Sequence, residues 1–172
     1  MMQQECTSID HNLYVGPRPE NHSDIEYLAG LGIQYIVDLT SGVGDDYNDD
    51  VNYIRNRMIE YINIPIIDAM APDQYAQHIL ESEVFPKILA GFNTYVHCRC
   101  GKGRSPTVVI YHYMNGGSTL KEALEFVQNK HLLTEITDEQ MRFLMALDQL
   151  QSEEDKEDLF EEYKQEKEYL NE

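Results

Sequence analysis

The sequence predicts one α/β domain, a compact unit whose central, mostly parallel sheet is flanked by helices. Two observations lead to this class. Short apolar runs rich in β-branched residues alternate with helical patterns over residues 1–150. The chain has 172 residues and is 42% hydrophobic, which is enough for one core. The composition changes near residue 150, so we expect the domain over 1–150 and a separate extension over 151–172.

Four short apolar runs are the predicted strands, and they cover residues 13–15, 33–39, 59–64 and 94–97. Each is mostly apolar rather than alternating, as is typical of strands that are buried on both faces of a parallel sheet. The first of them ends at Gly16-Pro17, a pair that marks a turn.

Helical patterns fill the gaps between these strands. Asn21 or Ser23 can cap a first helix, and 72–89 has helical spacing with an interruption at Pro86. In the last third, a helix opens at the Ser-Pro pair 105–106 and closes at the Gly-Gly pair 116–117. Capping boxes at 119–122 and 137–140 begin two more helices. A polar, glycine-flanked stretch predicts a solvated loop at Asp45, Asp46, Asp49 and Asp50.

The segment 151–172 is predicted to be a charged C-terminal helix. It carries ten acidic and three basic residues, a net charge of −7, and its apolar residues are spaced loosely along one helix face. Two interpretations stay open. The segment is either a solvated extension of the last core helix, or an arm that docks a partner or inhibits the domain.

The whole chain is strongly acidic, since 13 Lys and Arg oppose 31 Asp and Glu for a net charge of −18. Such a charge disfavours nucleic acid and anionic membranes as partners. No apolar run approaches the roughly 20 residues of a membrane span, and the N-terminus lacks the order of a signal peptide. We expect a cytoplasmic protein, with monomer as the expected oligomeric state.

Three cysteines, Cys6, Cys98 and Cys100, fit free thiols in a reducing compartment. Cys98-x-Cys100 lacks a second Cys or His pair at zinc-ligand spacing, so we expect neither a metal nor a cofactor.

One segment carries a pattern for phosphate chemistry, His97-Cys98 through Arg104-Ser105, between a predicted strand and a predicted helix. Its glycines let the backbone N–H groups turn inward, and the helix start adds a positive dipole end, so the segment predicts an anion cradle. These N–H groups and Arg104 favour the thiolate form of Cys98, a nucleophile beside a phosphate site. Arg104 can hold two phosphoryl oxygens, and Ser105 can donate to the sulfur.

Displacement of an alkoxide or phenoxide needs a proton donor on the opposite side, and Asp68 is the first candidate. It follows a predicted strand, 30 residues before Cys98, and its apolar neighbours Ile66 and Ile67 are expected to favour the protonated acid. Asp73 is the second candidate, although its place at a helix start is explained by N-capping alone.

His97-Cys98, five residues, then Arg104-Ser105 resembles the HCxxxxxR[ST] motif of the cysteine-dependent protein tyrosine phosphatase superfamily, and HCRCGKGRSP is most similar to its dual-specificity branch. The resemblance covers about residues 9–150. It implies a phosphocysteine at Cys98, Arg104 on the phosphoryl group, and Asp68 as acid and then base. It also implies that His97 braces the loop, without metal, and that the cradle is formed by Arg99, Cys100, Gly101, Lys102, Gly103 and Arg104.

The loop departs from the family pattern at two places. Lys102-Gly103 makes the loop resemble that of phosphoinositide 3-phosphatases, so lipid or inositol phosphates are the alternative to phosphotyrosine, phosphoserine and phosphothreonine in proteins. Cys100 is either a small side chain of the loop wall or a thiol that resolves an oxidised Cys98.

Two further alternatives are a phosphate-binding pseudophosphatase module and an RNA 5′-phosphatase. The first is disfavoured because Cys98, Arg104 and Asp68 are all present, and the second because only the loop is basic. Between Glu83 and Glu122 there is no acidic residue. A local positive well in a negative body therefore favours a phosphoprotein or soluble phosphoester over a lipid.

Overall fold

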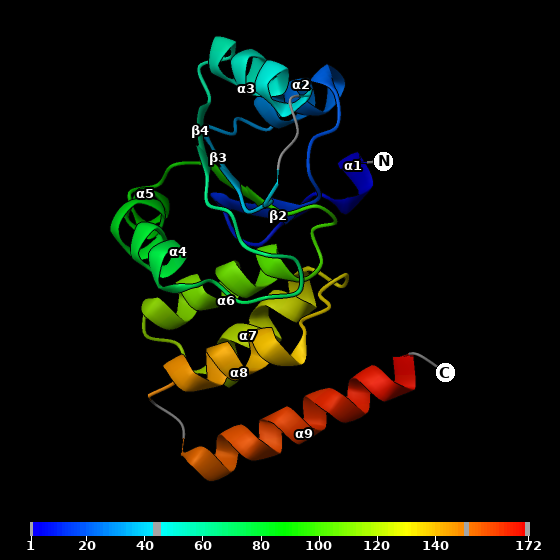
Figure 1. Ribbon diagram of the computed structural model, residues 1–172, viewed down its shortest axis with the longest axis vertical. Coiled ribbons are helices and arrows are strands. Elements are labelled where there is room, and N and C mark those ends of the chain that lie inside the picture. The colour runs from blue at the N-terminus through cyan, green and yellow to red at the C-terminus, as the bar shows by residue number, and fades with distance from the viewer. Residues whose placement is uncertain (1, 43–45, 150–151, 171–172) are drawn as a thin grey trace.

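The computed structural model describes residues 2–42, 46–149 and 152–170. Its five-stranded sheet, shown in Figure 1, has the order β1-β2-β5-β3-β4, with β1 antiparallel to β2 and every other pair parallel. The predicted α/β class with a mostly parallel sheet is confirmed. The strands are β1 (Thr7–Ser8), β2 (Leu13–Gly16), β3 (Tyr35–Asp38), β4 (Glu60–Asn63) and β5 (Thr94–His97).

Strand β5 lies between β2 and β3, so its carboxyl end opens in the middle of the sheet. All four of its residues are buried, as are those of β3, which explains their apolar composition. All four predicted strands are present, and among the strands of the described residues only β1 was missed. At two residues it is too short to show a pattern in the sequence.

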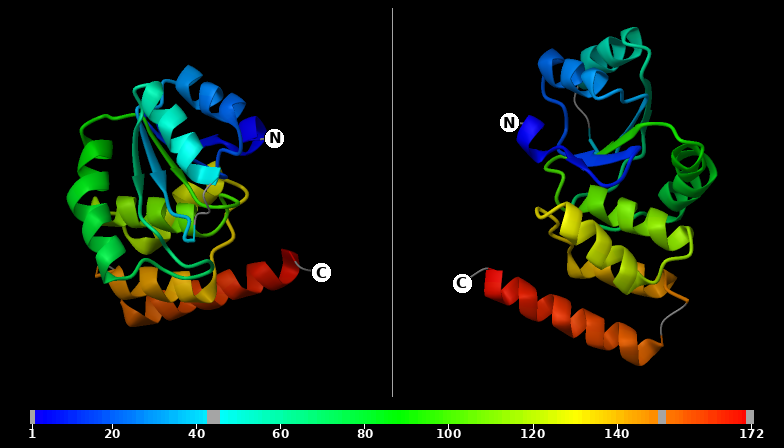
Figure 2. Two further views of the ribbon diagram at one scale, coloured as in Figure 1. Left: turned by 45° about the horizontal axis from the view of Figure 1, so that its top comes forward. Right: turned by 180° about the vertical axis from the view of Figure 1, so that it is seen from behind.

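Helices cover both faces of the sheet (Figures 1 and 2), with α2 and α3 on one face and α4 to α8 on the other. The strand side chains divide accordingly: Val37 and Val96 belong to the larger apolar cluster, and Ile36 and Tyr95 to the smaller one. The helices are α1 (Met2–Glu5), α2 (His22–Gly30), α3 (Asp46–Asn56), α4 (Gln74–Ile79), the π-helix η1 (Leu80–Val84), α5 (Phe85–Leu89), α6 (Arg104–Asn115), α7 (Leu120–Lys130), α8 (Asp138–Leu147) and α9 (Glu153–Leu170).

The predicted helix ends are largely confirmed. Asn21, rather than Ser23, caps α2 by accepting a hydrogen bond from the Asp24 N–H. Both capping boxes form, at Thr119 and at Thr137. The interruption predicted at Pro86 is a π-helical turn before it, and Pro86 itself lies in the first turn of α5, where a proline needs no N–H partner.

The solvated loop predicted around the acidic residues is wrong for Asp46, Asp49 and Asp50, whose backbone forms α3, while Asp45 lies outside the described residues. The cause is tertiary packing at the other end of this helix. Ile54 is completely buried in the smaller cluster and Tyr53 packs against it, so these two side chains anchor a helix that is mostly polar.

The acidic C-terminal segment forms α9, which packs along the helical side of the domain (Figure 1). Leu159 and Tyr163 are buried in the larger cluster, and the Tyr163 hydroxyl donates to the carbonyl of Ile136. These contacts attach α9 to the core of the domain. The boundary at residue 150 stays a prediction. Among the described residues, no helix is long and apolar enough to span a membrane.

Candidate active site

The phosphate loop, residues 98–103, connects the carboxyl end of β5 with the first residue of α6. This is the carboxyl edge of the parallel strands, where α/β proteins place their ligands. A cavity of about 500 Å³ opens over the loop, and Cys98, Arg104 and Asp68 all line it. The three side chains that the sequence singled out for chemistry therefore face one space.

In the phosphate loop, backbone carbonyl oxygens are hydrogen-bonded to the surrounding described residues, whereas the backbone N–H groups are not. Its carbonyl oxygens accept hydrogen bonds from outside the loop: that of Arg99 from the Arg18 N–H, that of Gly101 from His131, and that of Lys102 from the Glu135 N–H. The N–H groups of 99–103 donate to no group in the described part of the chain. They remain available for an anion, as an anion cradle requires.

Gly101 is needed for two reasons. Its φ of +75° lies in the left-handed region, and a Cβ there would stand 2.4 Å from the carbonyl carbon of Gly16. Gly103 is less demanding, since a Cβ there would lie 3.3 Å from the Gln140 Oε1. The close approach of Gly101 to the end of β2 fixes the shape of the loop.

Cys98 is buried, and its Sγ lies 3.4 Å from the Ser105 Oγ, within hydrogen-bond distance. His97 precedes it and is also completely buried. The His97 Nδ1 lies 3.3 Å from the Cys98 carbonyl oxygen and 3.7 Å from the Asp38 Oδ1. Burial lowers the pKa of His97, although Asp38 opposes the shift. A neutral His97 can brace the backbone of the nucleophile.

Arg104 is held in a fixed orientation under the cavity, with only 5% of its side chain exposed. Its Nη1 donates to the Ile66 carbonyl oxygen at 2.9 Å and lies 3.5 Å from that of Leu39, while its Nη2 lies 3.0 Å from the Asp68 Oδ1. A guanidinium with its rotamer already fixed can present a planar fork to a phosphoryl group at a small cost in entropy.

Asp68 lies on an exposed turn after β4, which we call the acid loop, residues 65–71. Its side chain is 82% exposed, so the apolar surroundings expected from Ile66 and Ile67 are absent. Ile66 is buried away from the carboxylate, and Ile67 points to solvent at 70% exposure. Arg104 is the contact that aims Asp68 into the cavity.

Helix α8 holds the acid loop from the other side. The Thr137 hydroxyl donates to the Ala69 carbonyl oxygen at 2.8 Å, and the Gln140 Nε2 donates to that of Met70 at 3.1 Å. Asp73, the second candidate acid, accepts from the Ala76 N–H as the N-cap of α4, and it does not line this cavity. Asp68 is therefore the better placed of the two carboxylates.

Three residues important to the site were missed at the level of sequence: Asp38, His131 and Gln140. Asp38 is completely buried at the end of β3 and accepts from the Tyr61 hydroxyl at 2.6 Å. The His131 Nε2 lies 2.8 Å from the Gly101 carbonyl oxygen. The sequence identified Gln140 as part of a capping box and not as a neighbour of the site. No sequence motif around Asp38 or His131 indicates that they lie beside the phosphate loop.

The remaining loop side chains, those of Arg99, Cys100 and Lys102, lie at the rim of the same cavity. Arg99 and Cys100 are exposed, and the Lys102 Nζ lies 3.3 Å from the Glu135 Oε1, so that one of the two extra cations is partly neutralised. The described residues contain no group of three or more His, Cys, Asp or Glu side chains that could hold a metal ion.

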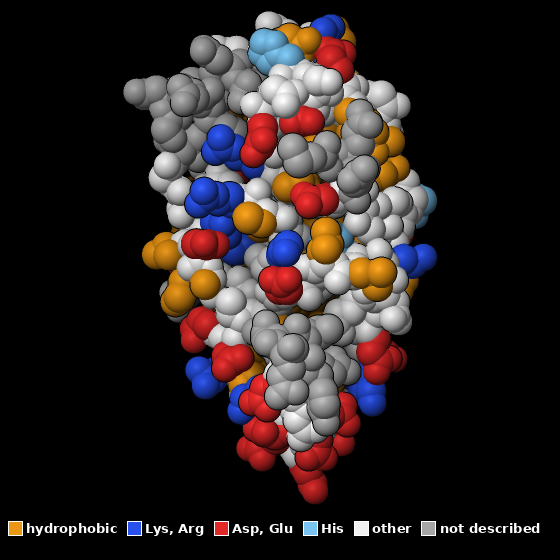
Figure 3. Space-filling model, turned by 90° about the vertical axis from the view of Figure 1, so that its right-hand side faces the viewer, with side chains coloured by type: hydrophobic (Ala, Val, Ile, Leu, Met, Phe, Trp, Pro, Cys, Tyr) orange, Lys and Arg blue, Asp and Glu red, His pale blue; other side chains and the backbone are white. Residues whose placement is uncertain are grey.

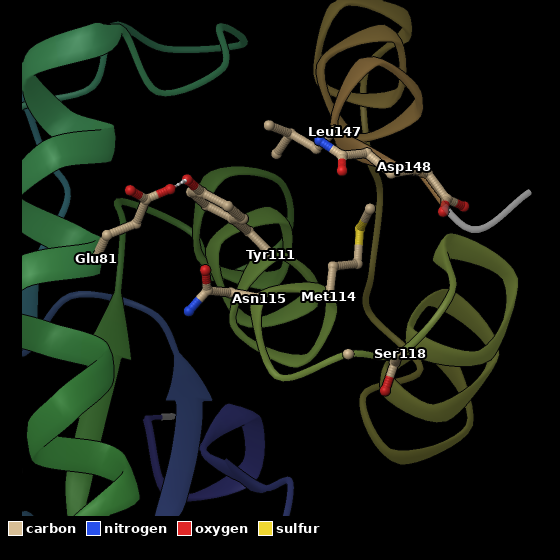
Figure 4. A pocket seen from close by; sticks show the side chains of 9 residues that line it. Glu81, Tyr111, Met114, Asn115, Ser118, Leu147 and Asp148 are labelled. Carbon is tan, nitrogen blue, oxygen red and sulfur yellow. Dashed lines mark hydrogen bonds between the residues drawn. The ribbon is translucent and has the colours of Figure 1, made fainter.

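Another cavity, of about 360 Å³, lies at the opposite end of α6 (Figure 4). The Tyr111 hydroxyl points across it and donates to Glu81, and Asp148 lines its far side. The described lining holds two carboxylates and neither a lysine nor an arginine, which is unsuitable for a phosphate. Phosphate chemistry therefore belongs to the amino end of α6.

Known structures share this fold. Tk-PTP, solved in its active form, is 25% identical, with a TM-score of 0.72 over 87% of this chain and 100% of that one. PTPMT1 in complex with PI(5)P is 17% identical, with a TM-score of 0.70 over 83% and 93%. The human tyrosine phosphatase-like serine/threonine/tyrosine-interacting protein is 21% identical, with a TM-score of 0.64 over 83% and 94%.

A sequence model of one family matches residues 6–160, which is most of the chain. Its description is PTP-SAK, Swiss Army Knife protein, DSP-PTPase phosphatase domain. The match includes the phosphate loop, the acid loop and the start of α9. This chain therefore belongs to the DSP-PTPase phosphatase domain family of Swiss Army Knife proteins.

Proposed function

We propose that this cysteine-dependent phosphatase hydrolyses phosphomonoesters in two steps at the cavity over the phosphate loop. The observation that carries the proposal is the convergence of a buried thiol, unclaimed backbone N–H groups and a fixed arginine with an aspartate opposite them. Such a set supplies nucleophile, oxyanion stabilisation and proton donor in one place.

In the first step the Cys98 thiolate attacks phosphorus and the bond to the leaving oxygen breaks. The Asp68 carboxyl group donates its proton to that oxygen, so the alcohol leaves neutral. Arg104 and the loop N–H groups stabilise the three equatorial oxygens. The phosphoryl group competes with Asp68 for Arg104 and so separates the ion pair between these two residues.

In the second step the Asp68 carboxylate takes a proton from water, the water oxygen attacks phosphorus, and the sulfur–phosphorus bond breaks. The thiolate leaves with the Ser105 hydroxyl beside it, 3.4 Å from the sulfur. His97 acts as a positioning residue through the backbone of Cys98 rather than as a base.

Phosphotyrosine, phosphoserine and phosphothreonine in proteins are the proposed substrates. Three observations support them: the family of the chain, the ion pair that occupies Lys102, and the net charge of −18, which disfavours docking on an anionic bilayer. A cytoplasmic location, which the free cysteines support, is part of the same proposal, and so is a monomeric state.

Phosphoinositides are the second candidate, supported by the exposed cation Arg99 and by the shared fold of PTPMT1, which was solved with PI(5)P. Phosphate release from phosphopeptides and from a phosphoinositide panel, measured side by side, tests the choice. We expect the peptides to be preferred by about 100-fold in kcat/KM. A preference of that size for a phosphoinositide would contradict the proposal.

Turnover of an aryl phosphate separates an enzyme from a binding module. We expect the wild-type protein to hydrolyse p-nitrophenyl phosphate and Cys98→Ser to be inactive. Substantial activity of Cys98→Ser would overturn the mechanism, and inactivity of the wild-type protein would favour a phosphate-binding module instead.

A further inference from the structure

One segment, residues 131–140, contacts both loops of the active site, and we call it the bridging segment. It runs from the C-cap of α7 into the first turn of α8. The His131 Nε2 lies 2.8 Å from the Gly101 carbonyl oxygen, and the Glu135 N–H donates to that of Lys102 at 2.8 Å. Two of the three carbonyl oxygens that fix the phosphate loop are therefore bonded to this segment.

The same segment holds the acid loop. The Thr137 hydroxyl donates to the Ala69 carbonyl oxygen, and the Gln140 Nε2 donates to that of Met70. Thr137 and Gln140 also form the capping box of α8, so the start of this helix and the acid loop share two side chains. Because the bridging segment is bonded to both loops, its position sets how the nucleophile stands relative to the acid.

The bridging segment is itself anchored at its middle by α9. Residues 131–137, which the structure describes throughout, form neither a helix nor a strand. Ile136 is completely buried, and its carbonyl oxygen accepts a hydrogen bond from the Tyr163 hydroxyl. A buried carbonyl oxygen is costly without a partner, so this bond favours the conformation seen. Ile136 lies between Glu135, which binds the phosphate loop, and Thr137, which binds the acid loop.

Helix α9 is attached to the domain by one face. Leu159 and Tyr163 are four residues apart, so they lie on the same side of the helix, and both are buried in the larger cluster with Ile136. The Arg142 guanidinium of α8 lies over the Phe160 ring, 5.9 Å from its centroid. Much of the remaining surface of α9 is exposed and acidic, at Glu157, Asp158, Glu161 and Glu162.

Figure 3 shows the result, since acidic side chains cover the lower end of this face, which α9 forms. A helix with an apolar face on the core and an acidic face in water is docked on its own domain.

The position of α9 does not suit an inhibitory arm. None of its described residues lines the cavity over the phosphate loop, so α9 leaves the approach to Cys98 open. Tyr163 also lies outside residues 6–160, the range that the family model matches. The bond from Tyr163 to Ile136 is therefore a contact that this chain adds to the matched domain.

We propose that α9 is an intramolecular brace that holds the phosphate loop and the acid loop in their relative position, with Tyr163 as its positioning residue. The proposal rests on the phosphatase activity proposed above. Tyr163 acts at a distance from the reacting atoms: its hydroxyl fixes Ile136, and the neighbours of Ile136 bind the two loops. Loosening of α9 then lowers turnover although the cavity stays open.

Tyr163→Phe is the informative variant, because it removes the hydroxyl and keeps the buried ring. The matched control is Tyr111→Phe: Tyr111 is buried in the same cluster, and its hydroxyl donates to Glu81 at the opposite end of α6. The kcat and KM of both variants are measured for an alkyl phosphate and for p-nitrophenyl phosphate, at a temperature where circular dichroism shows every protein folded.

We expect Tyr163→Phe to lower kcat about fivefold or more for the alkyl phosphate and about twofold for p-nitrophenyl phosphate. The alkyl phosphate should suffer more because it depends on the acid loop, which is held by fewer contacts than the phosphate loop. Tyr111→Phe should leave the ratio of the two kcat values unchanged.

Hydrogen exchange, followed by mass spectrometry, gives a second measurement that does not depend on activity. We expect the backbone N–H groups of residues 65–71 and 131–140 to exchange faster in Tyr163→Phe than in the wild-type protein. The same two segments of Tyr111→Phe should exchange as they do in the wild-type protein.

Three results would overturn the proposal. The first is that the kcat for the alkyl phosphate, or the exchange of the two segments, is unchanged in Tyr163→Phe. The second is an equal loss of kcat in Tyr111→Phe, and the third is a higher kcat in Tyr163→Phe, which would make α9 an inhibitory arm. A failure of the proposed phosphatase function is distinguishable: the wild-type protein then hydrolyses neither substrate, while exchange still shows whether Tyr163 holds the two segments.

Discussion

The phosphate loop and the acid loop face each other across one cavity, yet they are held very differently. The phosphate loop is fixed by hydrogen bonds to three of its carbonyl oxygens and by the close contact of Gly101 with Gly16. The acid loop presents an exposed Asp68 and is held by Arg104, Thr137 and Gln140.

This difference matches the two roles in the reaction: the phosphate loop binds the phosphoryl group, and the acid loop transfers the proton. Binding and stabilisation of the transition state require donors that do not rearrange, and a closely packed loop provides them. The acid must approach the leaving group, release Arg104 to the phosphoryl group and return as a base, so a loop held by a few contacts is suitable. Damage to the two loops should therefore have different kinetic signatures.

The largest effect is expected from Gly101→Ala. The substitution forces an alanine into φ +75° and against Gly16, so the loop cannot keep its shape. We expect kcat/KM to fall about 1000-fold for every substrate. The affinity for vanadate, measured by calorimetry, should fall as well.

Gly91→Ala is the matched control for this variant. Its φ of +91° imposes similar backbone strain, but nothing lies within 4 Å of the new Cβ. Both variants should lose about 1 kcal/mol or more in free energy of unfolding, and only Gly101→Ala should lose activity. Equal activity of the two would show that the contact with Gly16 is unimportant.

The second effect concerns Asp68. Asp68→Asn removes the proton donor but keeps the shape, so the loss should depend on the leaving group. We expect kcat to fall about 100-fold or more for an alkyl phosphate and less than about tenfold for p-nitrophenyl phosphate, from steady-state rates. Equal losses for both substrates would assign proton transfer to another residue, and Asp73→Asn serves as the control.

A smaller effect is expected where α8 holds the acid loop. Thr137→Val removes the bond to Ala69 and the N-cap of α8, and kcat should fall about threefold to tenfold for the alkyl substrate while vanadate affinity stays unchanged. Thr119→Val removes the same kind of cap from α7, at the same cost of about 1 kcal/mol in free energy of unfolding. If both variants lower kcat equally, the effect is one of stability.

The smallest effect is the dependence of stability on pH. Burial lowers the pKa of His97, His112 and His131 from the ordinary value of about 6.5, so each is neutral in the folded protein and gains a proton more readily once unfolded. This contribution is complete above about pH 6.5 and is lost as the pH falls through the lowered values.

We therefore expect the free energy of unfolding, measured with urea, to decrease between pH 7 and pH 5. His131→Asn should reduce this slope, because it removes one of the three buried histidines that gain a proton on unfolding. A stability that is constant over this range would contradict the assignment of neutral, buried histidines.

The part of the site that is continuous in sequence could be predicted, and the part assembled from distant segments could not. Cys98, Arg104 and Ser105 lie within eight residues, so their spacing and the flanking strand and helix define one geometry. His131 reaches Gly101 from 30 residues away, and Asp38 lies at the end of another strand. The sheet order places Asp38 beside the loop, and the packing of the end of α7 places His131 there, and no local pattern encodes either.

The same limit explains the errors in the fold. The polar helix α3 depends on the burial of Ile54, a tertiary contact that overrides a composition typical of loops. The expected apolar surroundings of Asp68 failed because neighbours in sequence point in different directions in a turn: Ile66 faces the core and Ile67 faces solvent. A sequence shows which residues adjoin Asp68, but it does not show in which direction their side chains point in a turn.

The central claim is that Cys98 carries the phosphoryl group between the two steps, and trapping of that intermediate tests it most directly. The protein is mixed with a ³²P-labelled phosphotyrosine peptide, quenched in acid within milliseconds, and digested for mapping of the label. The account predicts label on the peptide that contains Cys98 and none on the Cys98→Ser variant. Label on any other residue, or labelling that persists in Cys98→Ser, would contradict it.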